Sequence, residues 1–150
     1  MMANTLTIGG VPEGFDADII LRQMQRDGRP LMHIARDDKR LAAFAEAVRF
    51  FAPDMPVIEF PAWDCLPYDR VSPNADISAR RMATLAGLVH GMPKQFILLT
   101  TLNAAMQRLP ARQVLRDAAF RAEVGRPIDE EALRSFLVRM GFSKAPTVLE

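Results

Sequence analysis

Two glycines near the start of the chain have the spacing of a nucleotide-binding loop. The P-loop pattern is G-x-x-x-x-G-K-[ST], and Gly9 and Gly14 match its two glycines. The pattern then requires a lysine that reaches the phosphates and a hydroxyl side chain that binds Mg²⁺. Phe15 and Asp16 stand at those two positions and can do neither. We therefore interpret the segment as a glycine turn into a helix capped by Asp16, whose carboxylate takes the place of a bound anion.

The single cysteine and the two histidines give little support for catalysis. A cysteine nucleophile needs a base within hydrogen-bond reach and a lowered pKa, and no local signature of a cysteine enzyme surrounds Cys65. His33 lies in an apolar segment and is interpreted as a core histidine, while His90 suits the C-terminal end of a helix. One cysteine excludes an intramolecular disulfide, and no spacing of His, Asp and Glu indicates a metal site.

Composition and charge are those of an ordinary globular protein. The 150 residues are 49% hydrophobic and 25% charged, and the formal net charge of +1 favours neither a nucleic-acid binder nor a membrane-surface protein. No apolar stretch is long enough to span a bilayer and no signal pattern opens the chain, so we expect no membrane partner and a cytoplasmic location. Arg80 and Arg81 could contact phosphate, but Asp64, Asp69 and Asp76 lie nearby and favour local salt bridges.

Strand and helix patterns alternate over residues 1–110. Strands are expected at 5–8, 30–35, 56–60 and 95–100. Helices are expected at 16–28, from 37 or 38 to 52, and at 76–90. The strand at 30–35 reads as buried, and that at 95–100 as the central one, because both are apolar runs. This order predicts an α/β domain with a parallel sheet and helices on both faces.

Two further expectations concern how these elements pack. The helix at 76–90 should face the sheet with Met82, Leu85, Ala86 and Val89. Residues 61–75 should be irregular, because three prolines interrupt them. We expect Trp63 and Tyr68 to pack under this irregular segment, since the burial of large aromatic side chains is favourable.

The pattern changes after Pro110. A possible strand at 118–124 precedes a helix that starts at Asp129, ends at Gly141 and repeats apolar residues at Leu133, Phe136, Leu137 and Met140. Another strand is expected to begin at 147–150. We interpret residues 111–150 as the opening of a second, small α+β domain whose remainder is missing.

One block of the sequence is distinctive. It runs from Phe60 to Leu88 and reads FPAWDCLPYDRVSPNADISARRMATLAGL. Its characteristic residues are Trp63 and Asp64, then Leu66, Pro67, Tyr68 and Asp69, then Ser72 and Pro73, and finally Ile77, Arg80, Thr84 and Leu85. A second group follows, with Asn103, Met106, Gln107 and Arg108. This pattern resembles the N-terminal region of the bacterial transcription-repair coupling factor family (Mfd), and the resemblance covers most of residues 30–150.

The resemblance implies a fold and a role. That region of the family is similar to the damage-recognition protein UvrB, so it implies a degenerate RecA-like, P-loop-like domain of the UvrB domain 1a type. It also implies that the P-loop at Gly9, Gly14, Phe15 and Asp16 has decayed and that this fragment holds no cofactor and no catalytic residue. ATP hydrolysis would belong to a DNA-translocase motor far downstream. UvrB inserts a long hairpin into DNA, but only a few residues separate Tyr68 from the helix at 76–90, so that activity is not implied.

The resemblance also implies partners. The second domain would recruit UvrA in transcription-coupled nucleotide-excision repair, and the module would help to hold the full-length translocase inactive through its other domains. The family's main UvrA contacts lie in a G-E-[YF]-x-x-R-G segment, which is expected beyond Glu150. RNA polymerase and DNA would be contacted only through downstream domains.

Two alternatives from other functional classes remain at this point. The chain could be a small nucleotide- or flavin-binding α/β enzyme with its ligand near Gly9 to Gly14. It could also be a DNA-binding module that uses Arg80, Arg81 and Arg108. A nucleotide titration tests the first alternative, and a salt-dependent DNA titration tests the second.

Overall fold

The computed structural model describes residues 5–65 and 70–145. The chain divides into two compact units, Met1–Leu109 and Pro110–Glu150. The motif residues Leu66, Pro67, Tyr68 and Asp69 and the strand expected at 147–150 lie outside the described residues.

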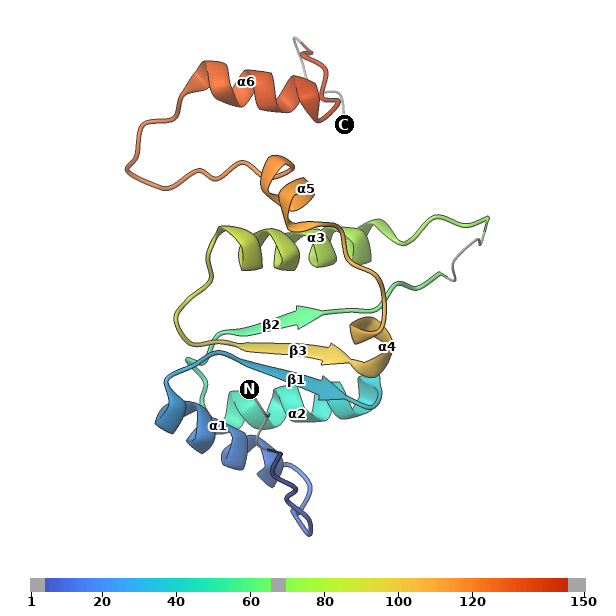
Figure 1. Ribbon diagram of the computed structural model, residues 1–150, viewed down its shortest axis with the longest axis vertical. Helices are drawn as coiled ribbons and strands as arrows, with labels where there is room; N and C mark the ends of the chain where they lie inside the picture. The colour runs from blue at the N-terminus through green and yellow to red at the C-terminus, as the bar shows by residue number, and fades with distance from the viewer. Residues whose placement is uncertain (1–4, 66–69, 146–150) are drawn as a thin grey trace. The chain divides into compact units, whose positions relative to one another are not determined.

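The first unit is built on a three-stranded parallel sheet. Its strands are β1 (Leu31–Ala35), β2 (Val57–Phe60) and β3 (Ile97–Thr101), in the order β1-β3-β2. Leu31 and Val57 are both in register with Ile97, so the last strand in the sequence is the central one (Figure 1). The predicted α/β class and the central position of the 95–100 segment are confirmed. The finer prediction, a UvrB-like or RecA-like topology, stays a prediction.

Four helices of the described residues accompany this sheet. They are α1 (Phe15–Asp27), α2 (Asp38–Phe51), α3 (Ala75–His90) and the short α4 (Leu102–Ala105), which the sequence reading did not anticipate. In Figure 1, α3 lies on one side of the sheet and α1 and α2 lie on the other. Asp37 caps α2 by accepting from the Arg40 N–H at 2.8 Å, as expected. Thr101 caps α4 in the same way, because β3 runs directly into that helix.

The core lies between α1, α2 and the sheet. It consists of Ala17, Leu21 and Met24 from α1, Phe44, Ala45 and Val48 from α2, and Ile97 and Leu99 from β3. The helical spacing of these side chains places them on one face of each helix. The alternation along β3 directs Ile97 and Leu99 to the same face of the sheet. In α2 the buried residues are Phe44, Ala45 and Val48, and Leu41 packs against them partly buried.

Two strand predictions need correction. Residues 5–8 form no strand, and Leu6 is 81% exposed. The segment at 30–35 forms β1 as expected but is not fully buried, because the strand order places it at the edge of the sheet. Met32 is 57% exposed and Ile34 is 47% exposed. An apolar run does not by itself distinguish an edge strand from a central one.

The face of α3 also differs from the expected one. Arg81, Thr84 and Leu85 are buried, whereas Met82 is exposed. The apolar periodicity predicted that Met82 faces the sheet, because arginine was counted as a surface residue and Arg81 was therefore left out of the buried face. The aromatic side chains around Arg81, described below, reverse that preference.

The second unit contains two helices among its described residues, α5 (Arg112–Asp117) and α6 (Glu130–Arg139). The strand expected at 118–124 is wrong, because this stretch is irregular after α5 ends. The α6 prediction is confirmed: Asp129 accepts from the N–H groups of Glu131 and Ala132 at 3.0 Å, and Gly141 has a φ of 86° just past the helix. No residue of α6 is buried.

Candidate functional site

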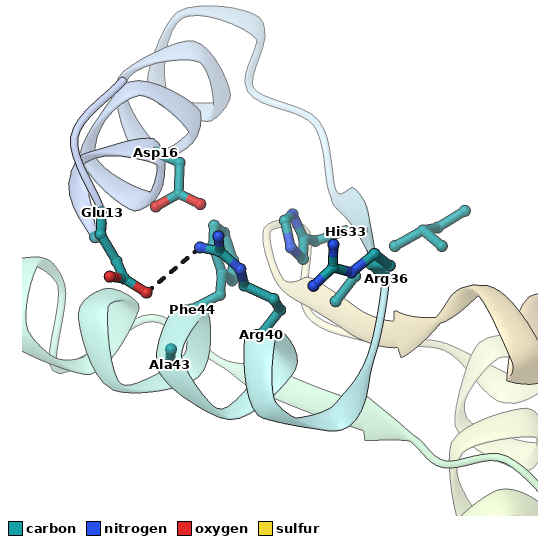
Figure 2. Close-up of a pocket in the computed structure, with 10 residues that line it drawn as sticks. Glu13, Asp16, His33, Arg36, Arg40, Ala43 and Phe44 are labelled. Atoms are coloured by element: carbon teal, nitrogen blue, oxygen red, sulfur yellow. Dashed lines mark hydrogen bonds and ion pairs between the residues drawn. The ribbon is translucent and has the colours of Figure 1, made fainter. Parts of the chain in front are cut away.

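A pocket of about 300 Å³ lies where α1 begins and β1 ends (Figure 2). Its walls come from the turn before α1, from the end of β1 and from the first turns of α2. Ligands of open α/β sheets bind at the carboxyl ends of the strands, so this is the place where a nucleotide or flavin would be expected.

The charges of this pocket neutralise one another. Arg40 forms an ion pair with Glu13 at 3.4 Å (Figure 2). Arg36 forms one with the adjacent Asp37 at 3.1 Å. Asp16 adds a further carboxylate to the wall. An anionic ligand would have to displace a carboxylate from each arginine, and the pocket therefore lacks the unpaired cationic character of a phosphate site.

His33 lies in the same pocket and is partly buried. Its imidazole stacks on the Phe44 ring with centroids 3.7 Å apart and an interplanar angle of 3°. Burial lowers the pKa of His33, and the Asp16 carboxylate opposes part of that shift. The ring is therefore neutral at pH 7, and its main contact is hydrophobic. The expected core histidine is correct in character but is only partly enclosed.

The glycine turn does not have the geometry of a phosphate loop. No strand precedes it in residues 5–14, and α1 begins after Gly14, which has a φ of 83° and is the N-cap. Asp16 is therefore not the cap, which corrects the prediction. Its carboxylate lies in the first turn and accepts from the Ala17 N–H at 3.1 Å, so a negative charge still occupies the helix N-terminus. Phe15 contacts Phe51 edge-on with centroids 6.2 Å apart.

A second cluster of side chains in the first unit surrounds Arg81 of α3. Arg81 is 1% exposed, and its guanidinium lies over two aromatic rings, with Cζ 4.2 Å from the Phe60 centroid and 4.4 Å from the Trp63 centroid. One of its terminal nitrogens donates to the Pro61 carbonyl and, at 3.1 Å, to Oε1 of Gln107. The same Gln107 oxygen accepts from the backbone N–H of Trp63 at 3.0 Å. One arginine thus joins α3, the end of β2 and the segment after α4.

The electrostatics of this cluster are unusual. No carboxylate of the described residues forms an ion pair with Arg81, and its buried Nε has no hydrogen-bond partner there. Burial lowers the pKa of Arg81, but an arginine stays cationic. The two aromatic faces therefore supply the favourable electrostatic contact. A side chain enclosed in this way cannot contact a phosphate, which removes Arg81 from the DNA-binding alternative.

A side-chain hydrogen bond joins the two ends of the irregular segment that follows Trp63. The Asp64 carboxylate accepts from the Asn74 N–H at 3.1 and 3.3 Å, and Asn74 in turn caps α3 through the Asp76 N–H at 2.8 Å. Thr84 fixes α3 to the sheet by donating to the Glu59 carbonyl at 3.0 Å. The two ends of the segment are thus held by side chains on its own flanks.

Comparison with known proteins identifies the family. No family model matches the chain. It is 34% identical over 127 residues to the transcription-repair-coupling factor of Myxococcus xanthus, covering 79% of this chain and 10% of that protein. It is 28% identical over 134 residues to that of Escherichia coli (strain K12), covering 89% and 11%, respectively. It is 28% identical over 143 residues to that of Haemophilus influenzae, covering 95% and 12%. The chain belongs to the transcription-repair-coupling factor family. It spans about a tenth of the length of these curated relatives.

The recognition of this family from sequence motifs is confirmed. The structure brings two of the motif residues, Trp63 and Gln107, into contact with Arg81, while the exposed Asp64 accepts from Asn74 at the base of the irregular segment. Trp63, which was expected to be buried, is partly buried: one face of its ring covers the Arg81 guanidinium. In this coupling-factor region Trp63, Asp64 and Gln107 therefore have structural roles.

Other motif residues lie on the surface. Arg80 forms ion pairs with Asp76 at 3.0 Å and with Glu59 at 3.7 Å, as the local salt-bridge prediction required. Ser72 and Arg108 are exposed, and Pro73 is partly buried. No role is visible for these three.

The remaining candidates do not form a reactive group. Cys65 is a partly buried free thiol, and His90 lies in the last turn of α3. Within residues 5–65 and 70–145, no three side chains of the His, Cys, Asp and Glu types come together to hold a metal ion. In the same residues no helix is long and apolar enough to cross a membrane.

Sequence reasoning missed the buried role of Arg81 and its stacking on Phe60. A signal was present in the spacing: Arg81, Thr84 and Leu85 follow the i, i+3, i+4 pattern of one helix face. An arginine at such a position, shortly after an aromatic-rich irregular segment, indicates a cation held between rings.

Proposed function

We propose that this chain is a non-catalytic scaffold of a transcription-repair-coupling factor, which acts in transcription-coupled nucleotide-excision repair. It recruits UvrA and helps to restrain the translocase activity of the longer protein. The observation that carries this proposal is the use of the family motif: Trp63 and Gln107 pack around Arg81, and Asp64 joins the ends of the irregular segment through Asn74.

The glycine turn supports the same proposal. A nucleotide site needs a lysine and a hydroxyl after the second glycine, and here Phe15 packs on Phe51 while Asp16 brings a negative charge to the helix N-terminus. ATP chemistry in such a coupling factor would then reside in another part of the protein, and the chain itself uses no cofactor.

We expect the chain not to bind ATP or ADP at millimolar concentration. Isothermal titration calorimetry with each nucleotide and Mg²⁺ checks this, and a glutamine variant of Asp16 serves as the matched control because it removes the opposing charge without adding a lysine. A saturable site of micromolar strength that is lost in Gly14→Asp would contradict the scaffold proposal and favour the nucleotide-binding alternative.

UvrA capture tests the recruiting role. The contact segment of the family is expected beyond Glu150, and arginine-based contacts require a rigid base. We expect the 150-residue chain to capture UvrA weakly. A version that continues through the contact segment should capture it at least about tenfold better, which corresponds to roughly 1.4 kcal/mol of binding free energy. A pull-down with both proteins measures this. Equal capture would place the UvrA surface within residues 1–150 and defeat this part of the proposal.

A further inference from the structure

The last stretch of the first unit is held by one side chain. Residues 105–109 end this unit, and all of them are exposed except Gln107, which is partly buried. The main-chain N–H of Gln107 bonds locally, to the Ala104 carbonyl at 3.2 Å. Within the described residues, the hydrogen bonds that tie this stretch to α3 and to the irregular segment both end on Oε1 of Gln107. That oxygen is therefore the anchor of the stretch.

The anchor serves two segments at once. The Gln107 oxygen accepts from the Arg81 guanidinium at 3.1 Å and from the backbone N–H of Trp63, where the irregular segment begins, at 3.0 Å. The Trp63 ring covers the same guanidinium, with its centroid 4.4 Å from Cζ. Movement of Trp63 away from Arg81 would thus break one bond of Gln107 and expose the other to water. The irregular segment and the stretch at 105–109 belong to one network.

This network is incompletely paired. Arg81 is 1% exposed, yet its Nε has no hydrogen-bond partner among the described residues. A donor that is buried without a partner keeps its desolvation cost. Water would pair Nε if Trp63 moved away, so an open arrangement recovers part of that cost. The closed arrangement is therefore favoured by less than a fully paired cluster would be, and local opening is correspondingly easier.

We propose that Arg81, Trp63 and Gln107 form a latch that couples the irregular segment to the stretch at 105–109. Displacement of Trp63 releases Gln107, and release of Gln107 loosens Trp63 by the same coupling free energy. An event at the irregular segment is thereby transmitted to the part of the chain that leads into the second unit.

Limited digestion of the 150-residue chain with trypsin tests the latch, because the exposed Arg108 lies within the stretch that it holds. The rate of cleavage after Arg108 follows the open population when closing is faster than cleavage. Gln107→Ala should raise this rate at least about fivefold, because it removes a charge-assisted hydrogen bond. Gln107→Glu should lower the rate, because its carboxylate keeps the acceptor and adds a negative charge beside Arg81.

A substitution in the irregular segment tests the coupling at a distance. The exposed Asp64 carboxylate accepts from the Asn74 N–H and holds this segment beside the latch. Asp64→Ala leaves Gln107 intact but should still raise cleavage after Arg108 at least about twofold, because it loosens the segment. Ser72→Ala, at an exposed serine of the same segment, is the matched control and should leave the rate unchanged.

Tryptophan fluorescence tests the reverse direction of the coupling. The emission of Trp63 should shift to longer wavelength in folded Gln107→Ala, because the ring loosens when the anchor of its backbone N–H is lost. Thr84→Val removes a different hydrogen bond of α3, the one to the Glu59 carbonyl, and should leave both the emission and the cleavage after Arg108 unchanged. The proposal is wrong if Thr84→Val reproduces either effect.

General unfolding would give a different pattern of cleavage. Cleavage after Arg49, within α2, requires the loss of that helix and should not change in Gln107→Ala. Equal rises at Arg49 and Arg108 would overturn the proposal, because they would report unfolding of the whole unit. A rate of cleavage after Arg108 that responds to neither Gln107→Ala nor Asp64→Ala would overturn it too, and a response to Gln107→Ala alone would remove the coupling to the irregular segment.

Discussion

Replacing Arg81 with alanine is expected to lower the free energy of unfolding of the first unit by about 3–5 kcal/mol. The substitution removes a cation held between the Phe60 and Trp63 rings, and it removes the donor of the Pro61 carbonyl and of Gln107. Each stacking contact contributes up to about 2 kcal/mol when desolvated, and the Pro61 carbonyl, left without this donor, costs about 1–3 kcal/mol, whereas Gln107 Oε1 keeps the backbone N–H of Trp63. Urea denaturation measures the effect.

The neighbouring arginine supplies the control. Arg80 has two ion pairs, but its side chain is 47% exposed, so Arg80→Ala should cost only about 0–1 kcal/mol. Trp63 is the only tryptophan, so its fluorescence reports directly on the cluster. The emission of Arg81→Ala should shift toward that of a solvated indole even before unfolding. Equal destabilisation by the two variants would contradict the structural role given to Arg81.

A double-mutant cycle separates the hydrogen bond from the stacking. Gln107→Ala removes the oxygen shared by Arg81 and the Trp63 N–H. We expect the combined variant to be less destabilised than the sum of the single variants, because the two residues belong to one network. Additive losses would show that Gln107 and Arg81 act independently.

The amide hydrogens of α6 are expected to exchange at least about a hundredfold faster than those of β3, after correction for intrinsic rates. Ile97 and Leu99 are fully buried at the centre of the sheet, so their amides open only with most of the first unit. No residue of α6 is buried, and its apolar side chains Leu133, Phe136 and Leu137 are only partly covered. Such a helix opens by local fluctuation at little cost in free energy.

Hydrogen–deuterium exchange followed by mass spectrometry measures both segments in one sample, so solvent conditions cannot cause the difference. Asp129→Ala should increase the exchange of α6 further, because it removes the cap of that helix, and should leave β3 unchanged. Protection of α6 within tenfold of β3 would contradict the expectation and would indicate a cover for its apolar face.

The elements with strong local signals were predictable from the sequence. Asp37 before a periodic apolar pattern gave the start of α2, and Asp129 with Gly141 gave both ends of α6. The central position of β3 followed from its apolar run. In each case local hydrogen bonding and side-chain periodicity agree with the tertiary structure.

The failures share one physical cause, which is that the deciding contact lies far away in the sequence. Leu6 and Ile8 have a strand-like pattern but no neighbouring strand to pair with in the described residues. Arg81 is buried only because Phe60, Trp63 and Gln107 converge on it from three segments. Tertiary context of this kind overrides local preference. The family was recognisable because its motif residues build that context.

The order of strands also has a consequence for biosynthesis. β1 and β2 are not neighbours, and each pairs only with β3, which is the last strand of the sheet to be made. During translation the first two strands therefore have no partner in this sheet until Thr101 has been synthesised and released for folding. Both contacts are distant in sequence, so their loop-closure entropy must be overcome at the same late stage. A ribosome that pauses before β3 would hold a chain with two unpaired strands, which is the kind of intermediate most exposed to aggregation and to chaperone binding.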